Sequence, residues 1–274
     1  MMFIARVFFS PNSSTRMNFR PLLTALLAGS IGAAHAQQTA KPEETEVYEP
    51  VPNVVTPGNT SADAPSDALR LFDGKNLDQW VLTSDHSAPA NWTVAGGILT
   101  VKKDVGNIET KRSFGNYQLH VEWRIPANIS GTGQARGNSG VFLASTGKGD
   151  LGYELQIVDA YQNKTYVNGT AGSIYKQAIP LANPARKPGE WQTYDVVWTA
   201  PVFGADGKLT SPAYATVFFN GVLVQNHTAL TGPTLYIGKP SYGPAHGPSP
   251  IKLQAHGDKS EPLSFRNIWV RELP

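Results

Sequence analysis

Beyond about residue 68, the chain consists of short segments in which apolar and polar residues alternate, and no window of helical length has a 3.6-residue apolar period. Asn220-Gly221 joins two such segments and is the strongest hairpin signal, and Ala95-Gly96-Gly97 predicts a second turn. Many strands at this spacing are typical of an all-β, antiparallel jelly-roll sandwich of two curved sheets, one with an open concave face. The expected strands are 92–94, 98–101, 117–125, 139–143, 153–158, 192–199, 214–219, 222–225, 251–256 and 263–272.

Three of these segments carry ionisable and amide side chains on their polar face. These are Glu154 and Gln156 in segment 153–159; His120, Glu122 and Arg124 in segment 117–124; and Lys252, Gln254 and His256 in segment 251–256. If the three strands share a sheet, they form an ionisable surface suited to a hydroxyl-rich ligand. The alternative for each strand is a solvated outer face without a function.

The first 36 residues have the features of a secretory signal. A basic start at Met17, which is a better initiator than Met1, precedes an apolar run and the cleavage motif Ala34-His35-Ala36. An uncleaved anchor is the weaker alternative, because the run is short for a membrane span. We therefore expect a signal peptide over 1–36, a disordered linker over 37–67, one β-sandwich domain over 68–274, and a periplasmic or secreted protein.

Composition excludes several classes of function. The sequence contains no cysteine, so disulfides do not stabilise it and its stability must come from a packed core. Its net charge of +2, with scattered basic residues, argues against nucleic acid or an anionic membrane as the partner. No segment after the signal is apolar enough to cross a bilayer.

Several blocks occur in the order found in a known family. They are LFDGKNLDQW (71–80), GNSGVFL (137–143), YELQIVDAY (153–161), GEWQTYDVVW (189–198), FFNGVLVQN (218–226) and SEPLSFRNIWVREL (260–273). Over residues 70–273 the chain resembles the bacterial 3-keto-disaccharide hydrolase domain family, whose members have a concanavalin A-like sandwich related in shape to family-16 glycoside hydrolases.

The resemblance implies a reaction on 3-keto-glycosides, supplied by a separate sugar 3-dehydrogenase. The ketone acidifies the C2 proton, so that one base removes it and the glycosidic oxygen leaves C1 by β-elimination; water then adds back. This chemistry needs a base, a group that stabilises the enolate at O3, and an acid for the leaving group.

The polar faces offer candidates for each role. Glu154 or His256 is the expected base, and Arg124 or Lys252 would stabilise the enolate oxygen. Glu122, which we count among the catalytic residues, is expected to hold hydroxyls together with Gln156 and Gln254. Asn138, Arg136 and Tyr175 are expected at the rim or wall of the cleft. Tyr175 could also donate a proton. For Asn138 and Tyr175, turn and core positions are equally good readings.

Three alternatives stay open. A classical glycosidase would pair Glu154 with Asp159, although without a bulge Asp159 falls on the opposite face, and Gln156 replaces the middle acid of the Glu-x-Asp-x-x-Glu pattern. No cofactor is required, but a divalent cation could bind His120, Glu122, Glu154 and His256. The third alternative is a non-catalytic glycan-binding sandwich, which would rely on aromatic platforms and neutral amides rather than ionisable groups.

Overall fold

The computed structural model describes residues 40–274, and the chain divides into compact units at Pro52/Asn53. The expected signal peptide over 1–36 lies outside the described residues. In the described part of the first unit, residues 40–52, the regular element is a short 3-10 turn, η1 (Pro42–Glu44). No helix within residues 40–274 is long and apolar enough to cross a membrane.

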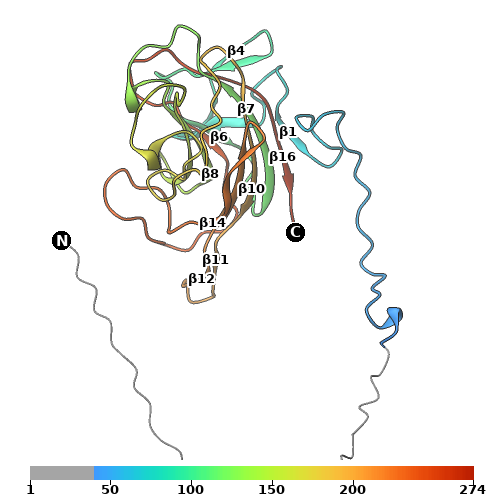
Figure 1. The fold of residues 1–274 in the computed structure, drawn as a ribbon. Coiled ribbons are helices and arrows are strands. Elements are labelled where there is room, and N and C mark those ends of the chain that lie inside the picture. The colour runs from blue at the N-terminus through green and yellow to red at the C-terminus, as the bar shows by residue number, and fades with distance from the viewer. Residues whose placement is uncertain (1–39) are drawn as a thin grey trace, which may run out of the picture. The chain divides into compact units, whose positions relative to one another are not determined.

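The second unit is an antiparallel β-sandwich (Figure 1), which confirms the predicted fold class. The larger sheet has the order β14 (Val222–Ala229), β13 (Tyr214–Phe219), β10 (Gln192–Thr199), β7 (Tyr117–Arg124), β16 (Ser264–Glu272), β5 (Ile98–Thr100) and β4 (Thr93–Ala95), with β1 (Leu69–Phe72) also pairing with β16. The smaller sheet has the order β3 (Asp85–Pro89), β2 (Trp80–Leu82), β6 (Ile108–Thr110), β15 (Lys252–Leu253), β8 (Ser139–Ser145) and β9 (Gly152–Ile157). A two-stranded ribbon, β11 (Val202–Phe203) and β12 (Leu209–Ser211), and the 3-10 turns η2 (Gly133–Ala135) and η3 (Val167–Gly169) complete the described elements.

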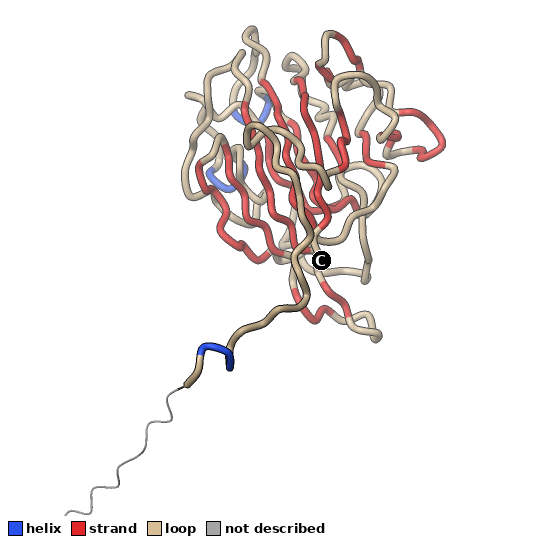
Figure 2. The backbone as a smooth tube through the Cα atoms, turned by 90° about the vertical axis from the view of Figure 1, so that its right-hand side faces the viewer, coloured by secondary structure: helices blue, strands red, loops and turns tan. Residues whose placement is uncertain are grey.

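Both hairpins expected from the sequence are present. Asn220 and Gly221 have φ values of 50° and 78° between β13 and β14, and Gly96 and Gly97 have values of 58° and 78° between β4 and β5. Positive φ at both central residues is the geometry that matches the twist of the flanking strands, and it favours Asn-Gly and Gly-Gly pairs. In Figure 2 the strands run as long, roughly aligned segments joined by such turns and by longer loops.

The core lies between the two sheets and is formed by the apolar set of each alternating strand. Trp123 and Trp198, both predicted core residues, are 1% and 0% exposed. Trp269, also expected in the core, is buried instead on the outer face of the larger sheet, where it stacks on His120 and donates a hydrogen bond to the carbonyl of Ala62. The compact unit thus begins before the expected boundary at residue 68, because segment 53–67 packs on that outer face.

The smaller sheet turns its polar side chains outward in two cross-strand rows. Lys252 of β15 lies opposite both Glu109 of β6 and Phe142 of β8, and Phe142 lies opposite Glu154 of β9. In the next row, Gly140 lies opposite Gln156, and Gly140 accepts a hydrogen bond from the backbone of Gln254. We call this outer surface of β6, β15, β8 and β9 the site face.

The expectation that three polar strands share one sheet is wrong for β7. The strand lies in the larger sheet between β10 and β16, so its polar residues do not reach the site face. The pattern of β7 is still that of a strand with one core face, but the face opposite the core is covered by segment 53–67 and by side chains of β10 and β16. Alternation predicted the strand correctly and could not predict its neighbours.

Candidate functional site

A cavity of about 570 Å³ opens on the site face. Its floor comes from β9 and from the segment that follows β15, and its walls come from the loops 147–151 and 231–238. The residues that line it are Asn138, Lys148, Asp150, Leu151, Glu154, Gln156, Tyr175, Thr234, Leu235, Tyr236, Gln254 and His256. Six residues that the sequence singled out are therefore brought together: Glu154, His256, Gln156, Gln254, Asn138 and Tyr175.

Glu154 occupies the floor of this cavity and is 5% exposed. Its carboxyl group lies over Gly140, where a β-carbon would be only 2.5 Å from Oε1. Burial, together with the nearby Asp150 carboxylate and against an opposing effect of Lys252, raises the pKa of Glu154 to about 8. Near pH 7 this side chain is therefore mostly a neutral carboxylic acid, which can donate a hydrogen bond.

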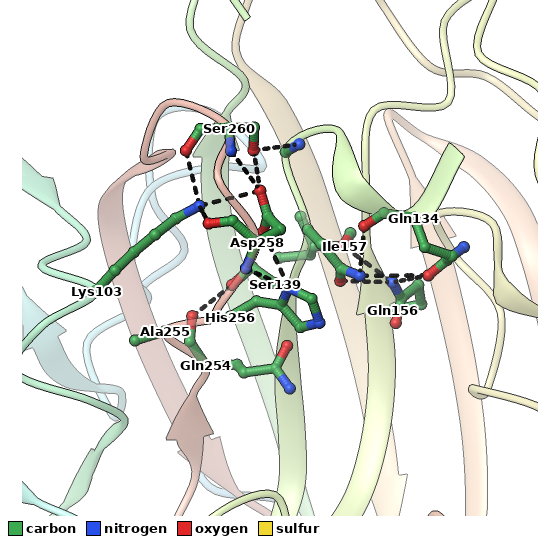
Figure 3. Close-up of polar contacts among 12 residues, drawn as sticks. Lys103, Gln134, Ser139, Gln156, Ile157, Gln254, Ala255, His256, Asp258 and Ser260 are labelled. Carbon is green, nitrogen blue, oxygen red and sulfur yellow. Dashed lines mark hydrogen bonds and ion pairs between the residues drawn. The ribbon is translucent and has the colours of Figure 1, made fainter. Parts of the chain in front are cut away.

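His256 points into the cavity beside the amides (Figure 3), and its side chain is 35% exposed. Its Nδ1 lies 2.9 Å from Oδ2 of Asp258. Burial by itself raises the pKa of Asp258, but hydrogen bonds from His256, Ser260 and Lys103 lower it well below the ordinary value. An ionised carboxylate only accepts, so in the tautomer with the proton on Nδ1 this nitrogen donates to Asp258 and Nε2 holds the lone pair. The backbone N–H of Asp258 also lies 3.2 Å from Nδ1.

Asp258 is itself held from the other side. Nζ of Lys103 donates to Oδ1 of Asp258 at 3.1 Å and to the carbonyls of Asp258 and Ser260 at 2.9 and 2.8 Å. The backbone and hydroxyl of Ser260 also donate to Oδ1. Figure 3 shows this sequence of contacts from Lys103 through Asp258 to His256. A histidine fixed by a buried carboxylate in this way has its tautomer and ring orientation set in advance.

Two amide side chains present unpaired acceptors on the site face. Gln156 and Gln254 are 1% and 4% exposed, and Oε1 of each has no hydrogen-bond partner within residues 40–274. Nε2 of Gln156 donates to Oδ1 of Asn138 at 3.0 Å, and Nδ2 of Asn138 donates to the carbonyl of Gln134 at 2.9 Å. These two hydrogen bonds fix the orientation of the Gln156 amide. Buried acceptors without partners are costly unless a ligand supplies a donor, and sugar hydroxyls are such donors.

Tyr175 stands at the edge of the cavity, and its hydroxyl lies 2.5 Å from that of Tyr166. Burial and the neighbouring Tyr166 raise the pKa of Tyr175 far above the ordinary value. The phenol therefore stays protonated over the whole physiological range and can donate a hydrogen bond.

Lys252 lies on the site face but does not line the cavity. Its Nζ donates to the carbonyls of Gly147, Gly149 and Leu151 at 2.8–2.9 Å, so all three of its hydrogens are engaged. Burial lowers the pKa of Lys252 to about 8. The side chain thus holds the loop that carries Lys148, Asp150 and Leu151 to the cavity wall, and it has no free donor for an enolate.

Arg136 and Asp159 are likewise engaged with each other rather than with the cavity. Nε of Arg136 lies 2.6 Å from Oδ2 of Asp159, and Asp159 is 2% exposed and also accepts a hydrogen bond from the backbone of Tyr161. Neither residue lines the 570 Å³ cavity. Asp159 and Glu154 therefore do not flank a common substrate bond.

The polar residues of β7 form a separate buried cluster in the larger sheet. Nδ1 of His120 lies 2.7 Å from Asp195, while Glu122 accepts hydrogen bonds from Arg266 and Asn267 at 2.6 and 2.9 Å. Burial alone lowers the pKa of His120, but the two carboxylates outweigh it and raise it to about 9. Arg124 packs its guanidinium 4.5 Å from the centre of the Trp191 ring.

The four-residue metal set considered from the sequence does not assemble. His120 and Glu122 belong to the larger sheet, and Glu154 and His256 to the site face of the smaller one. Within residues 40–274, no three or more His, Cys, Asp or Glu side chains are grouped in a way that could hold a metal ion.

Sequence reasoning missed Asp258, which lies behind His256, and several residues that line the cavity. Asp258 follows His256 by two positions, and a His-x-Asp spacing next to a polar strand is a usable signal. Lys148, Asp150, Thr234, Leu235 and Tyr236 lie in loops, where alternation carries no information. Thr234 is tied to the sheet, since its hydroxyl accepts a hydrogen bond from the backbone of Glu154.

Comparison with known proteins adds the family. The model of a 3-keto-alpha-glucoside-1,2-lyase-like domain matches residues 67–271. Among curated proteins, none matches the sequence significantly.

Two solved structures with the same fold come from one organism. The crystal structure of a putative glycosyl hydrolase from Parabacteroides distasonis ATCC 8503 is 51% identical, with a TM-score of 0.78, and the match covers 85% of this chain and 97% of the other. Another structure described in the same words, from the same organism, is 24% identical with a TM-score of 0.51, covering 75% of this chain and 99% of the other. At that identity the second match shows the fold alone.

Proposed function

Because the chain belongs to the family of 3-keto-alpha-glucoside-1,2-lyase-like domains, we propose that it cleaves the glycosidic bond of 3-keto-glycosides by β-elimination. A base takes the C2 proton, the electron pair forms the C1–C2 double bond through the enolate, and the C1–O bond breaks with protonation of the leaving oxygen. Addition of water across the new double bond gives net hydrolysis. The family and the 51% identical putative glycosyl hydrolase support the coarser statement that the chain is a carbohydrate-active hydrolase or lyase.

His256 is the base in this proposal. In the tautomer with the proton on Nδ1, its Nε2 has the free lone pair, and the ionised Asp258 stabilises the imidazolium that forms when the C2 proton arrives. Glu154 was the other candidate base, but near neutral pH its buried side chain already carries a proton. A group that is protonated at the working pH is a poor base and a good hydrogen-bond donor.

Glu154 then stabilises the enolate. A neutral carboxylic acid in a water-poor site donates a strong hydrogen bond to developing negative charge on an oxygen, here O3 of the sugar. The enolate needs a donor on the floor of the sugar cavity, and Glu154 lies there while Lys252 and Arg124 are engaged elsewhere. The unpaired acceptors of Gln156 and Gln254 would accept hydrogen bonds from the remaining sugar hydroxyls.

Tyr175 is the proposed proton donor to the leaving oxygen. It lines both the 570 Å³ cavity and an adjoining smaller one, as His256 does, so the two side chains flank the junction where a scissile bond would cross. Proton removal at C2 and proton delivery at O1 act on two atoms that are both bonded to C1, which requires such proximity.

The observation that carries the proposal is the coexistence, in one cavity, of a carboxyl group kept neutral by burial and a histidine held by an ionised aspartate. A classical glycosidase would need two carboxyl groups on opposite sides of the bond, and Asp159 is enclosed by Arg136 instead. We further propose that the protein acts after export, and that a separate sugar 3-dehydrogenase supplies its substrate, since the chemistry starts from a ketone at C3.

A substrate deuterated at C2 tests this function. Slower aglycone release from the deuterated 3-keto-glucoside than from the protonated one, together with transient ultraviolet absorbance of the C1–C2 enone, is expected for elimination. Equal rates under single-turnover conditions, with no enone, would mean direct displacement at C1. The His256→Ala variant should lose release, whereas Glu154→Gln, which keeps a donor, should retain part of it.

A further inference from the structure

A second cavity, of about 410 Å³, adjoins the first on the side of η2 and η3. The two cavities share Asn138, Tyr175, Tyr236 and His256 as lining residues. The second one adds Gln134, Ala135, Tyr166 and Lys176, whereas Glu154, Gln156 and Gln254 line only the first. A ligand that occupies both cavities would therefore cross between them at His256 and Tyr175.

The walls of the second cavity are aromatic. The ring centres of Tyr166 and Tyr175 lie 6.2 Å apart, and Tyr236, on the loop after β14, is 71% exposed. A tyrosine left this open beside a cavity offers a flat face for a ring, which is how proteins bind sugars and aromatic groups alike.

Lys176 places an ammonium group among these rings. Its Nζ lies 4.2 Å from the centre of the Tyr236 ring and 5.6 and 5.7 Å from those of Tyr175 and Tyr166. The position is fixed by the backbone: Lys176 has a left-handed φ of 58°, its N–H donates to Asn168 at 2.7 Å, and Nζ donates to the carbonyl of Tyr236 at 2.5 Å. The ammonium is thus held in place rather than free to sample solvent.

The charge of Lys176 is not balanced by an acidic neighbour. Within residues 40–274, the lysines that form salt bridges are Lys75, Lys103, Lys187 and Lys208, and no Asp or Glu lines the second cavity. The first cavity differs, because Asp150 and Glu154 both line it. Lys148 lines the first cavity too and offsets the charge of Asp150, while Glu154 is neutral near pH 7. Lys176 is therefore the cation without an acidic counterpart in its own cavity, and a ligand that spans both cavities meets it beyond the junction.

We propose that the second cavity binds the leaving group of the substrate and selects a ring that carries a carboxylate. This inference rests on the proposed function, which puts the 3-keto sugar in the first cavity. The ring would lie against Tyr236, and its carboxylate would pair with the ammonium of Lys176. Lys176 is then a specificity-determining residue that takes no part in bond breaking.

The test compares two leaving groups of nearly the same shape, 4-hydroxybenzoate and 4-hydroxybenzamide, each presented as its 3-keto-glucoside. The wild-type protein should have the higher kcat/KM for the benzoate, chiefly through a lower KM. Lys176→Gln, which can still donate to the carbonyl of Tyr236, should lose about twofold to fivefold on the benzoate alone, the size expected for a partly exposed ion pair. Lys176→Arg should keep the preference.

The outcomes separate this inference from the function on which it rests. If neither glycoside is cleaved by the wild-type protein, the proposed function fails. If both are cleaved equally well and Lys176→Gln leaves their ratio unchanged, the selection of an acidic ring is wrong while the function stands. A loss on both substrates in Lys176→Gln, with an unchanged ratio, would mean that Lys176 only holds the loop of Tyr236, and this also overturns the inference.

Discussion

The carboxyl group of Glu154 lies in the space that a side chain at Gly140 would fill, with Oε1 only 2.5 Å from the position of the missing β-carbon. The two residues are near neighbours on adjacent strands, since Gly140 pairs with Gln156 and Phe142 pairs with Glu154. The absence of a side chain at Gly140 therefore determines where the carboxyl group of Glu154, the proposed hydrogen-bond donor of the active site, lies.

Gly140→Ala should accordingly displace the Glu154 carboxyl group. We expect kcat to fall by about 10²-fold, the effect of a misplacement of about 1 Å, while the fold is retained. The matched control is Gly115→Ala, because no atom lies within 4 Å of a β-carbon there and its φ is not positive. Steady-state kinetics with a 3-keto-glucoside measure the effect, and wild-type kcat in Gly140→Ala would show that the placement of Glu154 does not matter.

Asp258→Asn should reduce activity by removing the charge that fixes the His256 tautomer. The expected loss is roughly 10–100-fold in kcat/KM, as for other partners that orient a functional histidine. Because the imidazolium would also lose its stabilising carboxylate, the acid limb of the pH profile should move to lower pH. The control is Lys103→Met, which removes a different partner of Asp258. This variant should have a lower melting temperature than wild type, but a smaller loss in kcat/KM than Asp258→Asn. An unchanged pH profile in Asp258→Asn would argue against His256 as the base.

The raised pKa of Glu154 predicts a specific pH dependence of stability. The folded state holds the proton up to about pH 8, whereas an unfolded chain releases it near 4.5, so the folded state binds more protons between these values. The free energy of unfolding should therefore fall as the pH rises from about 4.5 to about 8. Glu154→Gln should remove this slope and be more stable than wild type at pH 8, by roughly 4 kcal/mol. Urea denaturation across this range measures the difference, and parallel curves for both proteins would contradict a buried neutral Glu154.

Glu122→Ala should affect stability more than catalysis. The substitution leaves Arg266 and Asn267 without their acceptor and removes one of two carboxylates beside His120, so we expect a loss of about 3 kcal/mol. Arg124→Met, which changes a ring contact only, is the matched control and should cost less than about 1 kcal/mol. Both variants should keep the wild-type KM below their melting temperatures. A large rise in KM for either would place β7 at the substrate site after all.

Particular residues show how much of the fold and of the site could be predicted from the sequence. Alternation in segment 153–158 correctly put Glu154 and Gln156 opposite the core, and the segment that ends in His256 brought its polar residues to the same cavity. The same alternation in β7 was misleading, since a polar face can be covered by another part of the chain, here segment 53–67. The partners of Lys252 and Arg136 could not be predicted either, because loops contribute them. They are backbone carbonyls for Lys252 and a buried carboxylate for Arg136.

The residues that define the second cavity could not be predicted from the sequence either. Lys176 and Tyr236 are 60 positions apart, lie outside the regular strands, and meet because Nζ of the lysine reaches the carbonyl of the tyrosine. No periodicity links two loop residues, so only the folded chain reveals that they share a wall.

The most direct measurement is aglycone release from a 3-keto-glucoside and from its unoxidised parent, by the wild-type protein and by His256→Ala. We predict release from the keto sugar alone and its loss in the variant, because only the ketone makes the C2 proton acidic enough for an imidazole to remove. Release from the unoxidised parent would contradict the account and favour a two-carboxylate route, with Asp150 and Glu154 as the carboxyl groups that line the cavity. Binding of the glycoside without release from either sugar would instead identify a glycan-binding domain.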